Sequence, residues 1–202
     1  ITALVDYIYT PEPNLPPWGE KEILASRIEH FDQSKLPNTA QFDADLMNLF
    51  IVVELGDHSA TLLNGDTFEP ITRFKTRFAL HGGPKYSPDG RFVYFASRDG
   101  WISKYDIYNT KTVVEVRAGI NTRNIAVSSD GKYVMVGNYL PHTAVILDAT
   151  NLKPLKVIDV TDKNGKSSRV SAVYNAPPRT SFILALKDVK ELWEIPYSDE
   201  GG

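Results

Sequence analysis

A turn-and-strand motif occurs twice in this chain at a fixed spacing. Residues 89–94 (DGRFVY) align with residues 130–135 (DGKYVM), and Ser87 aligns with Ser128. The offset between the two copies is 41 residues. Repeats of about 40 to 45 residues, each with several short strands, are typical of β-propeller blades. The motif therefore predicts an all-β fold built from repeated small sheets.

Short β-type segments separated by turn dipeptides fill the chain from residue 45 to residue 196. They group in threes: residues 49–54, 60–64 and 70–74; residues 91–97, 101–107 and 112–118; and residues 132–138, 143–149 and 152–160. A looser fourth unit starts at Arg169 and includes residues 182–186 and 191–195. The pattern predicts about four blades.

The segment from Arg91 to Ser97 is the strand that the pattern constrains most. Successive side chains of a strand point to opposite faces, so Val93 and Phe95 share one face while two aromatic residues and Ala96 share the other. Because both faces are mostly apolar, we expect this strand in the middle of stacked sheets. The loop before it carries His81, the strongest metal-ligand candidate nearby.

The composition excludes several classes of function. The chain has 202 residues, a formal net charge of −3 and no cysteine. Without cysteine it forms no disulfide, thiolate zinc site, iron–sulfur cluster or covalent CxxCH heme attachment. No run of Lys or Arg exceeds two residues, which argues against a nucleic-acid interface. The apolar runs are too short to span a bilayer.

The first 44 residues differ in character from the rest. Residues 1–10 place apolar side chains at helical spacing and predict the last turns of a helix that ends a preceding domain. Residues 11–44 begin with a proline-rich stretch and are expected to be a linker and lead-in, with residues 20–30 as either helix or strand. Residues 45–202 are the expected partial propeller. With neither Met nor a basic signal region, the start indicates an internal cut in a longer polypeptide.

His81 has two interpretations. In the simpler one the ring bonds to a neighbouring backbone group, as histidines readily do. In the other it is an axial ligand of an iron macrocycle, because propeller loops converge at the centre and Gly82 and Gly83 would let a flat ring approach the backbone. The residues themselves leave both interpretations open.

Arginines recur beside strands of successive units, at Arg98, Arg123 and Arg169. A single loop arginine is usually solvated. Several that face one cavity would suit a ligand with multiple carboxylates, because the guanidinium group binds a carboxylate through two hydrogen bonds. Their recurrence in the same blade position makes all three candidates for ligand binding.

Tyr139 and His142 lie in an expected hairpin loop of the third unit. The simpler interpretation is a packing tyrosine and an exposed histidine. The functional one places a phenol and an imidazole over a bound substrate, as hydrogen-bond donors or proton carriers. No nucleophile triad, Walker loop or Rossmann glycine pattern accompanies them, so hydrolase chemistry has no support.

Six stretches resemble, in order, the heme d1-binding propeller of the cytochrome cd1 nitrite reductase family. They are residues 48–50 (NLF), 78–81 (FALH), 90–92 (GRF), 98–100 (RDG), 119–123 (GINTR) and 137–139 (GNY). The resemblance implies an eight-bladed propeller of which this chain supplies about four blades. It also implies that His81 ligates the heme d1 iron, that Arg98 and Arg123 pair with ring carboxylates, and that Tyr139 approaches the open face.

Within the family, the stretches HGGPKYSPDGR and INTRN are similar to the dihydro-heme d1 dehydrogenase branch. A longer loop after His81, no arginine near Gly56, and Leu140-Pro141-His142 in place of a Pro-Pro segment distinguish the chain from the nitrite reductases. The resemblance implies a periplasmic oxidoreductase of heme d1 biogenesis that oxidises dihydro-heme d1 and passes electrons to a heme c. Residues 1–10 are similar to the closing helix of a c-type cytochrome domain, so the heme c is expected in a preceding domain of that type. Tyr139 and His142 are then the candidate catalytic residues.

Two alternatives stay open. One is a cytochrome cd1 nitrite reductase of denitrification, which converts nitrite to nitric oxide. The other is a non-catalytic propeller that binds proteins. The expected partners are a tetrapyrrole, nitrite reductase or another heme d1 assembly protein, and a second copy of the chain in a homodimer. No nucleic acid and no membrane span are expected.

Overall fold

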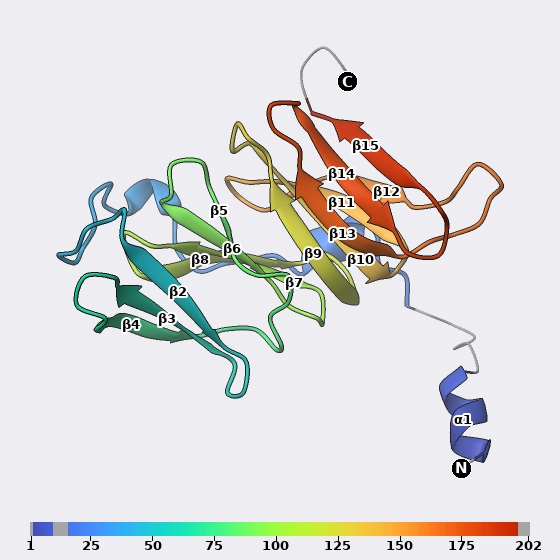
Figure 1. Cartoon of the computed structure of the whole chain (residues 1–202), viewed down its shortest axis with the longest axis horizontal. Coiled ribbons are helices and arrows are strands. Elements are labelled where there is room, and N and C mark those ends of the chain that lie inside the picture. The colour runs from blue at the N-terminus through green and yellow to red at the C-terminus, as the bar shows by residue number, and fades with distance from the viewer. Residues whose placement is uncertain (1, 10–15, 198–202) are drawn as a thin grey trace.

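The computed structural model describes residues 2–9 and 16–197, in which small β-sheets dominate (Figure 1). The helical elements are α1 (Thr2–Tyr9), α2 (Glu20–Ala25) and a single 3-10 turn, η1 (Gln33–Lys35). The expected cytochrome end (residues 1–10) and the expected linker (residues 11–44) lie partly outside the described residues. Within the described chain, neither α-helix has the length and apolarity needed to cross a bilayer.

Four antiparallel sheets follow one another along the chain, and we call them blades 1 to 4. Blade 1 contains β2 (Leu49–Glu54), β3 (Ser59–Asn64) and β4 (Pro70–Lys75). Blade 2 contains β5 (Lys85–Tyr86), β6 (Phe92–Ala96), β7 (Trp101–Asp106) and β8 (Lys111–Arg117), joined by β1 (Ile28–Glu29). Blade 3 contains β9 (Asn121–Val127), β10 (Tyr133–Leu140), β11 (Thr143–Asp148) and β12 (Pro154–Asp159). Blade 4 contains β13 (Val170–Asn175), β14 (Ser181–Leu186) and β15 (Leu192–Pro196). The expected all-β architecture with four blades is confirmed.

Blades 2 to 4 each begin with a strand that the sequence pattern did not predict as such. These strands are β5, β9 and β13, and each forms one edge of its sheet. We call this edge the inner edge; the opposite edge is formed by β1 in blade 2, β12 in blade 3 and β15 in blade 4. β5 has only two residues, and the first half of β9 is polar, so neither shows the alternation that signals a strand.

The expected position of β6 between stacked sheets is confirmed, because its two faces lie in different hydrophobic cores. Val93 and Phe95 pack in the core between blades 1 and 2. Tyr94 and Ala96 pack in the core between blades 2 and 3, where the Tyr94 hydroxyl donates to the Ala149 carbonyl at 2.8 Å. Burial of each large apolar side chain contributes about 1.5–3 kcal/mol to stability. β6 therefore stabilises the packing of blade 2 against blade 1 and against blade 3.

Blades 3 and 4 share a third core. Met135 and Ala144 from blade 3 pack with Val173, Phe182 and Leu184 from blade 4, and all five are almost inaccessible to solvent. Each neighbouring pair of blades therefore has its own core. The blades stack face to face in a row, as Figure 1 shows from β2 at one end to β15 at the other.

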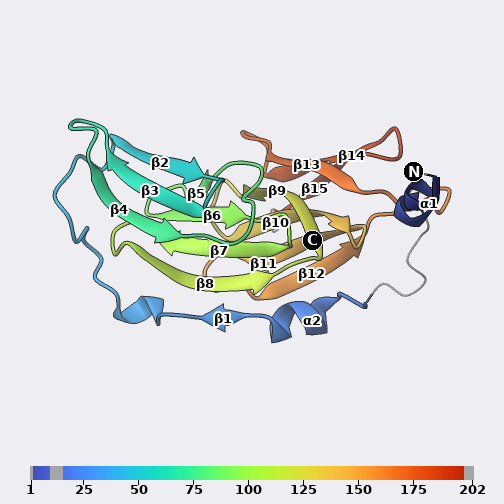
Figure 2. The same cartoon turned by 90° about the horizontal axis from the view of Figure 1, so that it is seen from below.

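The lead-in segment crosses the outer edge of blades 2 and 3 (Figure 2). Trp18 Nε1 donates to the Arg117 carbonyl at 3.0 Å, and Ile23 of α2 is fully buried in the core between these blades. β1 then pairs with β8, with Ile28 opposite Glu115. Residues 20–30 thus contain both a helix and a strand, where the sequence allowed either one. Expected as a linker, the described part of this segment forms a strap packed on the blades.

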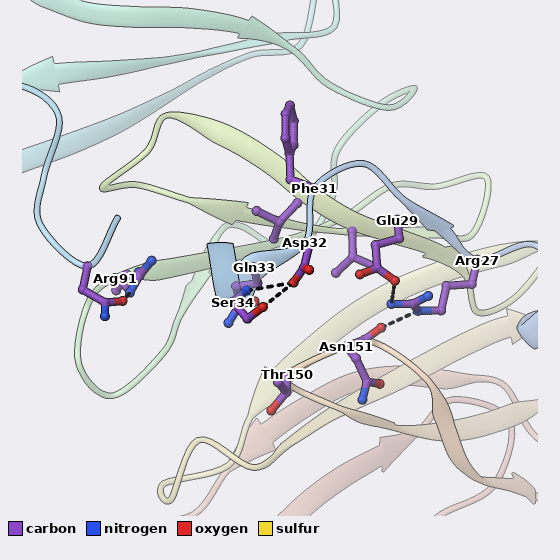
Figure 3. Close-up of a pocket in the computed structure, with 12 residues that line it drawn as sticks. Arg27, Glu29, Phe31, Asp32, Gln33, Ser34, Arg91, Thr150 and Asn151 are labelled. Atoms are coloured by element: carbon purple, nitrogen blue, oxygen red, sulfur yellow. Dashed lines mark hydrogen bonds and ion pairs between the residues drawn. The ribbon is translucent and has the colours of Figure 1, made fainter. Parts of the chain in front are cut away.

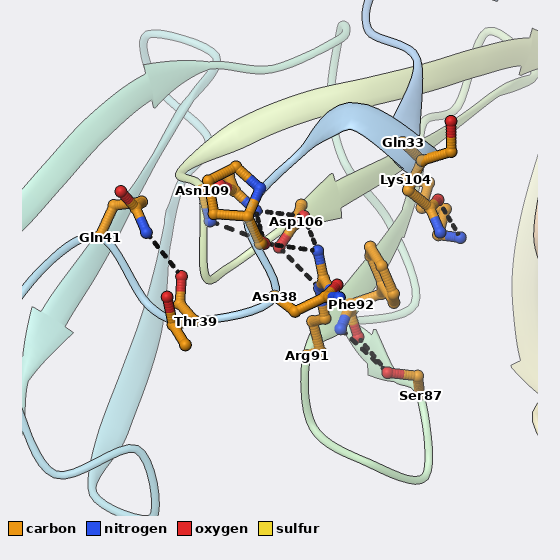
Figure 4. A network of polar contacts seen from close by, with 12 residues as sticks. Gln33, Asn38, Thr39, Gln41, Ser87, Arg91, Phe92, Lys104, Asp106 and Asn109 are labelled. Carbon is orange, nitrogen blue, oxygen red and sulfur yellow. Dashed lines mark hydrogen bonds and ion pairs between the residues drawn. The ribbon is translucent and has the colours of Figure 1, made fainter.

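A buried ion pair holds the far end of this strap (Figure 4). Arg91 donates to both carboxylate oxygens of Asp106, at 3.3 and 2.9 Å, and Asp106 is completely buried. Asn109 Nδ2 adds a hydrogen bond to Asp106 at 2.8 Å, and Arg91 also donates to Asn38 Oδ1 at 2.8 Å. The repeated motif residue Arg91 therefore joins a blade hairpin to the strap.

Candidate functional site

Most of the predicted site residues lie at one end of the blades. His81 precedes β5, Arg98 follows β6, Arg123 is near the start of β9, Tyr139 is near the end of β10, and Arg169 precedes β13. In an antiparallel sheet, one strand begins where its neighbour ends, so these positions belong to the same end of blades 2 to 4. We call it the His81 end.

The imidazole of His81 is oriented by a backbone carbonyl. Its Nδ1 lies 2.7 Å from the Arg123 carbonyl oxygen. A carbonyl oxygen only accepts hydrogen bonds, so Nδ1 carries the hydrogen and Nε2 of the neutral ring keeps its lone pair. The main chain of His81 is fixed too, because its N–H donates to the Ala96 carbonyl of β6 at 2.8 Å. This is the arrangement that metal-binding histidines use to aim the second nitrogen.

His81 lines an apolar pocket of about 440 Å³. The other residues of its wall are Ile51, Val53, Leu55, Leu80, Gly82, Gly83, Pro84, Phe95 and Ala96. The imidazole is the one polar side chain among these lining residues. The pocket lies between β2 of blade 1 and the loop that enters blade 2, and it therefore suits a largely apolar ligand with a group that the imidazole can bind.

The two glycines after His81 bring the backbone close to its neighbours. Gly82 and Gly83 have φ angles of +83° and +71°, in the region that other residues adopt at a penalty. A Cβ atom on Gly82 would lie 3.2 Å from the Arg123 carbonyl oxygen and 3.3 Å from the Asn124 side chain. Next to Gly83, only Lys85 Nζ would be within contact distance, at 3.8 Å. The loop thus packs tightly at Gly82 and leaves space at Gly83.

Two buried polar atoms beside this loop lack partners among the described residues. They are Arg123 Nε and Asn124 Oδ1. Buried polar groups in folded proteins are nearly always paired, so unpaired ones indicate that a ligand or water completes the site. Together with the free Nε2 of His81, they fit a tetrapyrrole with iron for the imidazole and carboxylates for the arginine.

Three cations surround the ring of Tyr139. The guanidinium carbon of Arg123 lies 4.8 Å from the ring centroid, that of Arg169 lies 5.2 Å away, and Lys187 Nζ lies 5.3 Å away. Cations within about 6 Å of an aromatic face are attracted to it. The structure therefore brings together three of the candidates from the sequence, Arg123, Tyr139 and Arg169, and adds Lys187, which the sequence reasoning missed. Lys187 follows an expected strand but belongs to no motif, so no local signal marked it.

Arg169 is bound to a carboxylate of its own blade. Its Nε and one terminal nitrogen donate to Asp188, with distances from 2.5 to 3.2 Å, and its backbone N–H donates to the same carboxylate at 2.9 Å. The hydrogen bonds from Arg169 lower the pKa of Asp188, so the pair is ionised at neutral pH. The charge of Arg169 is therefore offset, unlike that of Arg123.

Arg98 and His142 stand apart from this cluster. The Arg98 side chain is exposed and makes no hydrogen bond or ion pair with described residues, although its carbonyl accepts the Thr122 N–H at 3.3 Å. His142 Nδ1 is 2.6 Å from Ser167 Oγ on a surface loop. In the described part of the chain, no hydrogen bond, ion pair or ring contact joins His142 to Tyr139 or His81.

A second pocket, of about 460 Å³, lies under the strap (Figure 3). Arg27 crosses it, donating to the Asn151 carbonyl at 2.6 Å and to Glu29 at 3.0 Å. Arg27 and Glu29 in this pocket thus bind each other. Asn151 belongs to the turn between β11 and β12, which lies at the opposite end of blade 3 from Tyr139. Nor does any group of three or more His, Cys, Asp or Glu within the described residues have the arrangement of a metal site. The His81 end remains the better candidate for function.

Comparison with known proteins shows a match to one protein family and to several of its relatives. The model of the family described as "Cytochrome D1 heme domain" matches residues 44–202. A "Dihydro-heme d1 dehydrogenase" of Pseudomonas aeruginosa is 59% identical over 98% of this chain and 40% of its own length. A "Nitrite reductase" of Stutzerimonas stutzeri is 29% identical over 78% of this chain and 28% of its own length.

A solved structure gives the same result. The structure of "Dihydro-heme d1 dehydrogenase NirN in complex with DHE" superposes with a TM-score of 0.93 and 59% identity. The match covers 98% of this chain and 42% of that one. The chain thus spans less than half the length of each of these relatives.

Proposed function

Because this chain belongs to the cytochrome D1 heme domain family, we propose that its blades hold a heme d1-type tetrapyrrole at the His81 end. The protein as a whole is then an oxidoreductase that converts dihydro-heme d1 to heme d1. The observation that carries the proposal is the His81 imidazole, which is fixed through Nδ1 on the Arg123 carbonyl and keeps Nε2 free beside an apolar pocket. A neutral imidazole held in this way is suited to ligate iron.

Other residues of the His81 end would position the ring. The open space at Gly83 suits the approach of a flat macrocycle to the backbone. Arg123, whose guanidinium group makes no hydrogen bond with described residues, would pair with a ring carboxylate. The exposed side chain of Arg98 would turn toward a second carboxylate.

The tetrapyrrole, when bound, supplies the redox chemistry. Conversion of the dihydro form removes two electrons and two protons from a side chain of the ring. Tyr139 and His142 are the proposed proton carriers, because a phenol and an imidazole can each pass a proton to water. The Arg123 guanidinium against the Tyr139 ring would hold the phenol in place. The electrons would pass one at a time through a heme c in a domain that precedes residue 1 to an external electron acceptor.

The outer faces of blades 1 and 4 carry exposed apolar side chains that further blades of the whole protein would cover. Phe50 and Val52 on β2 are 51% and 41% exposed, and Tyr174 and Leu192 on blade 4 are 58% and 73% exposed. These side chains point away from the cores that their own strands form. We propose that residues 45–202 are part of a larger propeller whose other blades cover these faces.

We also propose that the protein acts in the periplasm, in heme d1 biogenesis for denitrification.

The proposal is tested by mixing the full-length protein with dihydro-heme d1 and an electron acceptor under anaerobic conditions. Growth of the heme d1 absorption spectrum at a rate that depends on protein concentration is the expected result. The runner-up is nitrite reduction, which the 29% identical relative favours. Nitric oxide formation from nitrite, without dihydro-heme d1 oxidation, would replace the first function by the second. A protein that binds no tetrapyrrole would be an interaction module.

A further inference from the structure

Two cationic side chains of blade 4 lie next to the same tyrosine ring. Arg169 precedes β13, and Lys187 directly follows β14. The two residues are joined by a backbone hydrogen bond of 2.9 Å from the Lys187 N–H to the Arg169 carbonyl. Both cationic groups lie just over 5 Å from the centroid of the Tyr139 ring. By position alone, either one could meet a ligand bound there.

The two cationic groups differ in how readily they can pair with a ligand carboxylate. The guanidinium group and the backbone N–H of Arg169 both donate hydrogen bonds to Asp188. A ligand carboxylate would therefore have to compete with this ion pair. Lys187 is exposed, and its ammonium group makes no hydrogen bond or ion pair with any described residue. Replacing an existing carboxylate gains little free energy, whereas pairing an unpaired ammonium gains more.

Arg123 is the other uncompensated cation at Tyr139. Its Nε is buried without a partner in the described residues, and its guanidinium carbon lies 4.8 Å from the ring centroid. An ammonium and a guanidinium group that gather at one ring repel each other unless an anion lies near both. The tyrosine ring offsets this repulsion only in part. The arrangement therefore favours an anionic ligand at this point.

We propose that Lys187 is a ligand-binding residue of the His81 end, and that it pairs with a peripheral carboxylate of the tetrapyrrole alongside Arg123. Arg169 and Asp188 instead form an internal pair that positions the loop carrying Lys187. This inference rests on the proposed function and assigns the blade 4 contact to Lys187 in place of Arg169, the candidate from the sequence. A flexible ammonium group can follow a carboxylate at the rim of a ring without a fixed hydrogen-bond geometry.

The test is a spectroscopic binding titration of the full-length protein with heme d1 and with its fully esterified form. Lys187→Gln should weaken binding of the free acid by about 10-fold, as expected for one charge-assisted pair. Binding of the ester should be the same for this variant and the wild type, since the ester has no carboxylate to pair. Lys190→Gln is the matched control, because Lys190 is an exposed lysine on the same turn. It should bind both forms like the wild type.

Three outcomes would overturn the inference in different ways. If Lys187→Gln binds free heme d1 as tightly as the wild type, while His81→Ala loses the iron-ligand spectrum, Lys187 has no role and the proposed function stands. If the wild type binds neither form, both proposals are wrong. A parallel titration of Arg169→Gln separates the two cations of blade 4. Arg169→Gln could bind the free acid and the ester equally well while Lys187→Gln still prefers the free acid. The ring carboxylate would then pair with Arg169 and not with Lys187.

Discussion

The His81 imidazole donates its Nδ1 hydrogen to the carbonyl oxygen of Arg123, 2.7 Å away, and so connects the loop of blade 2 to the first strand of blade 3. The same bond fixes the tautomer that leaves Nε2 unprotonated. The two interpretations of His81 from the sequence are therefore compatible. The ring bonds to a backbone group through one nitrogen and keeps the other for a ligand.

Substitution of Gly82 should disturb this connection specifically. In Gly82→Ala the positive φ angle costs about 1 kcal/mol, and the new Cβ would lie 3.2 Å from the Arg123 carbonyl that holds His81. Gly90→Ala is a matched control, because Gly90 has a φ of +72° but nothing within 4 Å of an added Cβ. Both variants should lose similar stability in urea unfolding. Only Gly82→Ala should also weaken heme d1 binding, and equal binding by the two variants would contradict this prediction.

Removal of the buried charge of Asp106 should destabilise the protein strongly. Asp106 is fully buried and accepts hydrogen bonds from Arg91 and Asn109. In Asp106→Asn the Arg91 guanidinium, whose side chain is only 13% exposed, keeps its charge without a counterion. Breaking a buried pair in this way costs about 3–5 kcal/mol.

The denaturation midpoint in urea measures this effect. Asp130→Asn is the control, because the Lys132–Asp130 pair at 3.5 Å is on the surface and such pairs contribute about 0–1 kcal/mol. Similar midpoint shifts for the two variants would show that the Arg91–Asp106 pair does not hold the strap.

Much of the fold follows from the sequence, because its signals are local. The aligned turns at Asp89 and Asp130 predicted the blade repeat, and the two apolar faces of β6 predicted its place between two cores. The strands that alternate were found. The two-residue β5 was not, because its pairing with β6 depends on Lys85 lying opposite Tyr94 and not on any pattern of its own.

The site was predicted less completely, because charge availability depends on contacts between distant residues. The sequence pointed to Arg123, Tyr139 and Arg169, which the structure brings together. It did not reveal that Asp188 neutralises Arg169, nor that Lys187 reaches the same ring. A contact of the same kind joins His30 Nε2 to the buried Glu115 carboxylate at 3.0 Å, across 85 positions of the chain, and no local motif signals it.

Lys104 should make stability rise with pH in the alkaline range. Its ammonium group is buried, donates to Gln33 at 2.8 Å and to the Thr150 carbonyl at 3.0 Å, and forms no ion pair with a carboxylate of the described residues. Burial lowers the pKa of Lys104 to about 8, whereas an unfolded lysine has a pKa of about 10.4. Between these values the unfolded chain binds more protons than the native one, so the native state gains stability as the pH rises.

Comparison with Lys104→Met isolates this contribution. Between pH 8 and pH 10, the unfolding free energy of the wild type relative to the variant should rise by up to about 1.4 kcal/mol per pH unit. Guanidinium denaturation at several pH values measures it. Parallel profiles for the two proteins would show that the lysine is not titrating in the buried site.

Glu115 should also make stability rise with pH, but in the acid range. Burial acts to raise its pKa, but hydrogen bonds from Arg77, Ser103 and His30 together outweigh burial, and the net effect is a lowered pKa. A carboxyl group whose native pKa is depressed stabilises the fold above its unfolded pKa of about 4.3, and this stability is lost as the pH falls through the native value. Glu115→Gln should therefore be less stable than the wild type at pH 7, by about 1–3 kcal/mol. The two unfolding free energies should converge in acid, and a constant gap down to pH 2 would exclude the ionised carboxylate as the cause.

The most direct test of the account is the visible spectrum of heme d1 added to the full-length His81→Ala protein. We predict that the variant loses the absorption bands of histidine-ligated iron and binds the tetrapyrrole more weakly. His30→Ala, which changes a histidine of the strap that contacts Glu115 and lies outside the proposed site, should give the wild-type spectrum. An unchanged spectrum and affinity for His81→Ala would contradict the assignment of this imidazole as the iron ligand.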